Sequence, residues 1–273
     1  MPESLHTPGQ KIDTSLPEFQ NLKTKYFFNL ALHERGALDF HKTEGLWQRD
    51  ETGEREWGNV SEHCLVEVAR VQVIAQALGL DENLSGDLMT AAALHDYFKK
   101  AEKAILERKG LTWEAYEEAQ QIVAKNLTEA GFGKRIVKLV GSVGHSTVFD
   151  AEALLLKPEL TEDDIAWLIM HYVDDYTIGS EWVRETEDVG NLKVNDLDRR
   201  MDKNEADPRY KILNEAGREY YGGETAYQAQ RRVGHLIENR LAELINVRQG
   251  LSIQPVDLPV FIDNLLQQKI IGG

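Results

Sequence analysis

The sequence predicts an all-α protein, and three observations lead to this fold class. Apolar residues recur at helical spacing through most of the chain, several of these segments have recognisable helix ends, and no series of alternating apolar and polar residues indicates strands. The chain has 273 residues, of which 42% are hydrophobic and 28% charged, so it can bury a large core. We therefore expect a helical bundle.

The expected helices follow one another along the chain. The first begins near Glu62 and ends at Gly79, and the second ends at Gly110, since glycine often follows the last residue of a helix. A later helix has Thr161 as its candidate N-cap, with acidic residues in its first turn, where they favour the helix dipole. In chain order the expected helices cover residues 62–79, 84–110, 112–131, 133–146, 161–179 and 224–248, and a short one follows Pro259.

Two segments lack the helical pattern. Residues 44–59 could form a small hairpin that turns at Thr52-Gly53, or a flap over a pocket. Residues 185–210 are charged and rich in turn-forming residues, which predicts a loop before a C-terminal helical extension. We therefore expect a loose N-terminal arm at 1–20, a helical domain at 21–185, and a charged loop with C-terminal helices that pack on the same body at 186–273.

The composition restricts the partners of the protein. Its net charge of −15 repels a polyanionic backbone, so an extended nucleic acid is not expected, whereas a small anionic substrate remains compatible with a local metal and a few basic residues. We expect no membrane span, because no apolar run approaches the roughly 20 residues that one requires. The polar start lacks the pattern of a signal peptide, and Cys64 is the single cysteine, so we expect a cytoplasmic protein without disulfides. The sequence does not indicate an oligomeric state.

Histidines and aspartates lie together in several of the expected helices. Asp96 directly follows His95, and His171 shares a helix face with residues three and four positions further on. Imidazole and carboxylate groups together suit Zn, Fe or Mn, although none of these spacings is that of a zinc finger or an H-E-x-x-H site. The residues alone therefore leave two readings open, a metal site or separate core histidines. The candidates are His63, His95, Asp96, His145, His171, Asp174 and Asp175.

The order of these residues resembles the HD-domain metal-dependent phosphohydrolase superfamily. That family has the order H…HD…D on successive helices of one bundle, and here His63 is followed by His95-Asp96 and then by "HYVDD". The stretch "SEHCLVEVARVQVIAQALGL" is similar to the first helix of the family, and "AAALHDYFKK" is similar to its A-x-L-L-H-D-x-x-K element. The resemblance covers roughly residues 60–180 and implies an HD-domain-like bundle.

The resemblance also implies a role for each matching residue. A divalent metal ion (Mn, Fe, Zn, Ni or Co), one or two per chain, would be bound by His63, His95, Asp96 and Asp174, with Asp175 as the alternative to Asp174. Such an ion polarises a phosphoryl oxygen and activates a water molecule.

Three further roles concern catalysis. Asp96 would also orient the water, and Lys99 would contact a substrate phosphate. His145 would line the pocket as a metal ligand or as a phosphate donor. The chain offers fewer histidines between Asp96 and the last aspartate than family members with two metals.

The expected function is hydrolysis of a small phosphomonoester or phosphodiester, such as a nucleotide. Two alternatives remain open at this point. One is oxidation of a small substrate by a pair of irons in the same fold, and the other is a non-catalytic HD scaffold that binds a ligand or a partner.

Overall fold

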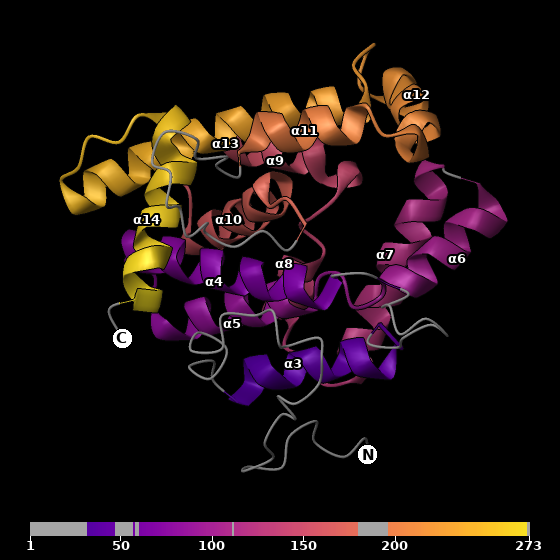
Figure 1. Cartoon of the computed structure of the whole chain (residues 1–273), viewed down its shortest axis with the longest axis horizontal. Coiled ribbons are helices and arrows are strands. Elements are labelled where there is room, and N and C mark those ends of the chain that lie inside the picture. Colours follow the sequence, from indigo (N-terminus) through magenta and orange to yellow (C-terminus); the bar gives the residue numbers. More distant parts are fainter. Residues whose placement is uncertain (1–31, 47–56, 58–59, 111, 180–195, 272–273) are drawn as a thin grey trace.

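The computed structural model describes residues 32–46, 57, 60–110, 112–179 and 196–271, and in these residues the protein is all-α, as predicted (Figure 1). The described residues contain no strand. Short 3-10 helices lie at His145–Thr147, Pro208–Tyr210 and Pro255–Asp257. The α-helices are α3 (Leu32–Thr43), α4 (Val60–Leu78), α5 (Glu82–Leu94), α6 (Lys99–Lys109), α7 (Trp113–Glu129), α8 (Lys134–Val140), α9 (Val148–Leu155), α10 (Glu162–Tyr176), α11 (Leu197–Glu205), α12 (Lys211–Tyr220), α13 (Ala226–Gln249) and α14 (Leu258–Ile271).

Local signals in the sequence set several helix ends. Gly79 follows α4 with a φ of 65°, a left-handed conformation that glycine adopts without a steric penalty. Thr161 is the N-cap of α10 and forms a capping box with Asp164, in which each side chain binds the backbone N–H of the other residue. These ends agree with the sequence prediction.

The single helix expected at residues 84–110 is wrong. Helix α5 ends at Leu94, and the chain turns through residues 95–98 before α6 begins. Backbone hydrogen bonds from Tyr97 to Leu94 and from Lys99 to Asp96 close this turn. The turn allows two consecutive aromatic residues, Tyr97 and Phe98, to be buried together, which one face of a straight helix would not permit.

The loop expected at residues 185–210 is also wrong in part, because it contains α11. Asp196 caps this helix by accepting a hydrogen bond from the Arg199 N–H. Leu197 is buried against Gly234 of α13, where a Cβ atom would lie 2.5 Å from the leucine side chain. The other positions of α11 are mostly charged, so the sequence lacks the apolar stripe that would indicate a helix. The sequence also did not predict α3, α9 or α12, and the helix expected at 133–146 ends at Val140.

Helix α4 lies at the centre of the molecule and is buried on almost every side. In Figure 1 it runs beside α5, with α10 and α13 above it and α14 across one end. One apolar core extends from Ala37 in α3 to Leu266 in α14, so the C-terminal helices share it. The domain boundaries stay predictions. The N-terminal arm at 1–20 and most of residues 44–59, expected to form a hairpin or a flap, lie outside the described residues.

A buried arginine connects the centre of the molecule to its last helix. The Arg70 side chain of α4 is fully buried and donates a hydrogen bond of 2.7 Å to the Thr177 hydroxyl, just after α10. Its guanidinium lies 3.8 Å from an Asp263 carboxylate oxygen of α14 and stacks over the Tyr176 ring. The buried Arg70 guanidinium therefore connects α4, α10 and α14.

No helix in the described part of the chain is long and apolar enough to cross a membrane.

Candidate metal centre

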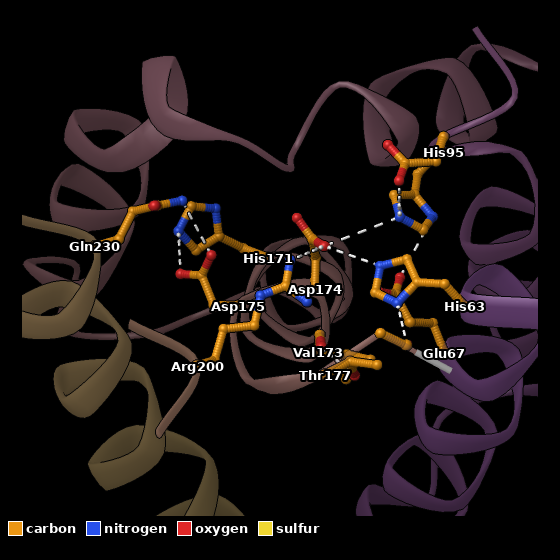
Figure 2. Close-up of polar contacts among 12 residues, drawn as sticks. His63, Glu67, His95, His171, Val173, Asp174, Asp175, Thr177, Arg200 and Gln230 are labelled. Carbon is orange, nitrogen blue, oxygen red and sulfur yellow. Dashed lines mark hydrogen bonds and ion pairs between the residues drawn. The ribbon is translucent and has the colours of Figure 1, made fainter. Parts of the chain in front are cut away.

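Four side chains from three segments of the bundle point to one place. His63 and Glu67 come from α4, His95 from the turn after α5, and Asp174 from the last turn of α10 (Figure 2). One donor atom of each side chain lies within 4.8 Å of the others. We call these four residues the donor group.

The two histidines of the donor group present the same ring nitrogen to it. His63 Nδ1 donates to the Gly179 carbonyl at 2.7 Å, and His95 Nδ1 donates to the Ala92 carbonyl at 2.8 Å. A carbonyl only accepts, so both Nδ1 atoms carry hydrogen and each Nε2 is available to a metal. The two Nε2 atoms lie 3.5 Å and 3.9 Å from the Asp174 Oδ1 atom, and that of His95 is buried without a hydrogen-bond partner.

Glu67 is the member of the donor group that the sequence analysis missed. Its side chain is fully buried, and neither carboxylate oxygen makes a hydrogen bond. One oxygen lies 2.8 Å from His63 Nε2, which is four residues earlier on the same helix. Burying a carboxylate is costly unless a cation or a metal compensates it. The signal for Glu67 was this spacing in an otherwise apolar helix.

The chemistry of the donor group fits a divalent cation. Nitrogen and carboxylate oxygen ligands lie about 2.0–2.2 Å from a zinc-like ion, so tetrahedral ligands are about 3.3–3.6 Å apart. The separations measured around His63 Nε2 and the Asp174 Oδ1 atom, which run from 2.8 Å to 3.9 Å, bracket this range. Two imidazoles with two carboxylates suit Zn, Fe or Mn. In the described residues this is the one group of the kind.

Asp174 and Asp175 point in different directions from α10 (Figure 2). Figure 2 shows Asp174 directed to the histidines of the donor group and Asp175 directed to His171 and Gln230. Gln230 donates to an Asp175 oxygen at 3.1 Å, and the other oxygen lies 3.4 Å from His171 Nε2. Of the two carboxylates that the sequence left open, the structure brings Asp174 into the donor group.

Asp96 lies beside the donor group and is not one of its four members. One carboxylate oxygen is 3.8 Å from His95 Nε2, and the other is 3.3 Å from the Lys99 ammonium. Burial by itself would raise the pKa of Asp96, but the positive charges of Lys99, His95 and His63 lower it to about 2. Asp96 is therefore ionised, and its role as a metal ligand stays a prediction.

Two cations flank the donor group. Lys99, which the sequence predicted, is half exposed and pairs with Asp96 and with Glu102 at 3.4 Å. These two carboxylates raise the pKa of Lys99 well above its usual value. Arg200 of α11 was missed because its helix was expected to be a loop, and its guanidinium lies 3.3 Å from the Asp174 Oδ1 atom.

The carboxylates of the donor group govern its protonation. Burial by itself lowers the pKa of His63, but the Glu67 and Asp174 carboxylates outweigh this effect and raise it to about 10. Burial by itself would raise the pKa of Asp174, but the His63 contact and the Arg200 charge hold it well below its usual range. Without a cation, a proton on His63 thus partly neutralises the buried carboxylates.

His145 lies outside the donor group. Its Nδ1 atom is 2.9 Å from the Gln230 amide oxygen, and its ring contacts the edges or faces of Tyr116 and Tyr227. Burial lowers the pKa of His145 to about 4, although the hydrogen bond with Gln230 raises it in part. The charges of Lys99 and Arg200 lower this pKa, and that of Asp174 raises it. Because Asp174 belongs to the donor group and Lys99 and Arg200 flank it, His145 lies near the site, and its role as a ligand or phosphate donor stays a prediction.

Comparison with known proteins adds no relative. No protein-family model matches the chain, and neither the curated proteins nor the solved structures contain a match. The resemblance to HD-domain phosphohydrolases therefore rests on the sequence motifs alone and stays a prediction.

Proposed function

We propose that the protein is a metal-dependent phosphohydrolase that acts on a small phosphomonoester or phosphodiester. One observation carries the proposal. Two buried imidazoles, each with its Nδ1 bound to a backbone carbonyl, direct Nε2 to the same carboxylate, which also contacts a guanidinium. Separate core histidines would have no need of this convergence.

The donor group would hold the cation, and the flanking charges would hold the substrate. A bound divalent ion supplies a Lewis acid for a phosphoryl oxygen and lowers the pKa of water. Arg200 and Lys99 offer the positive charge that a phosphate requires, the first as a planar donor pair and the second as a compact ammonium. Asp96 keeps Lys99 in place and can accept a hydrogen bond from a water molecule.

The charge of the whole chain favours a small substrate. A net charge of −15 opposes the approach of an extended polyanion, while Arg200, Lys99 and a bound cation give the site itself a local positive field. We therefore propose a small anionic substrate and no extended nucleic acid.

Metal analysis followed by a phosphate-release screen tests the proposal. We expect the purified protein to hold one divalent ion per chain, and to release phosphate from a member of a panel of nucleotides and sugar phosphates when that ion is present. Glu67→Gln should lose the ion, whereas Glu107→Gln, a control on the exposed face of α6, should keep it.

Two results would replace the proposal by one of its alternatives. A pair of irons per chain with substrate-dependent uptake of O₂ would favour the oxygenase. A bound ion without phosphate release from any compound of the panel, but with saturable binding of one of them, would favour the non-catalytic scaffold.

A further inference from the structure

A chain of polar side chains runs through the interior on the Asp175 side of α10. It links His171, Asp175, Gln230 and His145, and we call it the His171–His145 chain. All four side chains are buried or half-buried. Successive contacts measure 3.4 Å between His171 and Asp175, 3.1 Å between Asp175 and Gln230, and 2.9 Å between Gln230 and His145.

The direction of the hydrogen bonds is fixed at one end by the backbone. His171 Nδ1 lies 2.7 Å from the Ser142 carbonyl oxygen. This oxygen can only accept, so Nδ1 carries the hydrogen. The His171 ring is also stacked on Trp167, with the two planes 10° apart, which fixes the plane of the imidazole.

The next two contacts set the orientation of the Gln230 amide. Asp175 turns one carboxyl oxygen to His171 Nε2, at 3.4 Å, and the other to the Gln230 amide. A carboxyl oxygen that faces an NH₂ group accepts a hydrogen bond from it, whether or not the other oxygen carries a proton. The Gln230 NH₂ group donates to the Asp175 Oδ1 atom, and the Gln230 carbonyl oxygen is left facing His145 Nδ1.

The reversed Gln230 amide would not fit this environment. Its oxygen would then face the Asp175 Oδ1 atom, so that two acceptors would be in contact. The Asp175 Oδ1 atom would lose the hydrogen bond that it accepts in the structure, and the NH₂ group would face His145 Nδ1. An uncompensated buried polar group costs about 1–3 kcal/mol.

We propose that Gln230 is a positioning residue that holds neutral His145 in the Nδ1–H tautomer, so that its Nε2 is a hydrogen-bond acceptor. The oxygen of Gln230 accepts from Nδ1 at 2.9 Å, and ring contacts with Tyr116 and Tyr227 fix the imidazole plane. Burial, which lowers the pKa of His145 to about 4, keeps the ring neutral.

This inference rests on the proposed function and adds a substrate class to it. A neutral Nε2 that only accepts cannot donate to a phosphate oxygen, which leaves phosphate binding to Lys99 and Arg200. The acceptor instead recognises a hydroxyl or N–H group of the substrate, or a water molecule. We therefore expect the substrate to be a phosphoester that carries such a donor near its phosphate.

Nitrogen NMR of the protein labelled with ¹⁵N-histidine tests the tautomer directly. The His145 signals are the ones that disappear in His145→Gln. We expect an unprotonated Nε2 and a protonated Nδ1 for His145 near neutral pH, although free neutral imidazole side chains favour the opposite tautomer. A wild-type His145 with hydrogen on Nε2 would overturn the proposal.

Two variants of Gln230 distinguish the effect of its acceptor oxygen on the His145 tautomer from the effect of its size. Gln230→Met keeps the length of the side chain but removes the acceptor, so His145 should shift to a mixture of tautomers or to Nε2–H. Gln230→Glu keeps an acceptor, so Nδ1–H should persist. The control is Gln121→Met on the exposed face of α7, which should change nothing.

The outcome is independent of the metal. A Gln230→Met spectrum identical to wild type at His145 would show that Gln230 does not set the tautomer. Zn²⁺ binding measured on the same samples tests the donor group instead. A protein that binds no metal but has the expected His145 tautomer would refute the proposed function and leave the positioning role of Gln230 in place.

Discussion

Asp174 and Asp175 are neighbours in the chain, yet their surroundings differ in kind. On the Asp174 side, two histidines and two carboxylates converge, and buried donor atoms lack hydrogen-bond partners. On the Asp175 side, a histidine, a carboxyl and an amide form a directional chain that ends at a backbone carbonyl. The same residue types thus converge on one point on the Asp174 side and form a linear chain on the Asp175 side, where His171 Nε2 and the Asp175 Oδ2 atom also lack a hydrogen bond.

Substitution of the two aspartates should separate the two sides most strongly. Asp174→Ala removes a carboxylate that would bind the cation, so we expect metal affinity to fall at least 100-fold. This exceeds the roughly 10–100-fold loss that follows when a residue hydrogen-bonded to a metal ligand is removed. Asp175→Ala should change metal affinity far less. Competition titration with a metal-sensitive dye measures both. Equal losses in the two variants would remove the distinction between the sides.

Removal of the flanking cations should reduce activity and leave the metal bound. A charge-assisted hydrogen bond contributes about 1.5–3 kcal/mol, so Arg200→Ala or Lys99→Ala should reduce kcat/KM by about tenfold to hundredfold. Lys203→Ala, on the exposed face of α11, is the control. Lys99→Arg should restore only part of the activity, because a planar fork does not replace an ammonium. A Lys99→Ala enzyme with unchanged kinetics would show that this side chain is merely solvated.

Removal of the Asp175 side chain should affect stability instead of metal binding. His171 and Gln230 would each lose a buried partner, so we expect the free energy of unfolding to fall by about 1–3 kcal/mol. Asp150→Ala, on the exposed surface of α9, should change it by less than about 0.5 kcal/mol. Urea unfolding of the metal-free proteins measures both changes. An unchanged stability for Asp175→Ala would indicate that solvent replaces the lost contacts.

Metal binding on the Asp174 side should depend on pH. His63 has its pKa raised to about 10 in the metal-free fold, so a cation must displace its proton. Between pH 6.5 and 10 affinity should rise about tenfold per pH unit, which corresponds to about 1.4 kcal/mol. The same proton stabilises the metal-free fold fully below about pH 6.5, and this contribution is lost as pH rises through about 10. Isothermal titration in buffers of different ionisation enthalpy should count one released proton.

The sequence predicted the part of the site that follows from residue order and helix periodicity. His63, His95 and Asp174 could be recognised because each falls in or beside a strongly periodic helix. Glu67 was missed because a glutamate within a helix usually faces solvent. Its spacing from His63 is a signal, but only the packing of α4 on all sides shows that it is buried. Arg200 was missed because α11 has too few apolar residues to show helical periodicity.

The fold was predictable at the level of its class and less so at its turns. Helix ends marked by glycine or by a capping threonine were predicted well. The break between α5 and α6 contains neither glycine nor proline, so nothing in the local sequence announces it. It depends on Tyr97 packing on Phe40 of α3, a contact between residues far apart in the chain.

The buried Arg70 has a consequence for the order in which the protein matures. All members of the donor group, and Arg200, precede Asp263 in the chain and are synthesised before it. Until α14 has been synthesised, the guanidinium on the helix that carries His63 and Glu67 cannot pair with Asp263. We therefore expect the growing chain to acquire its metal only after α14 has docked on α4.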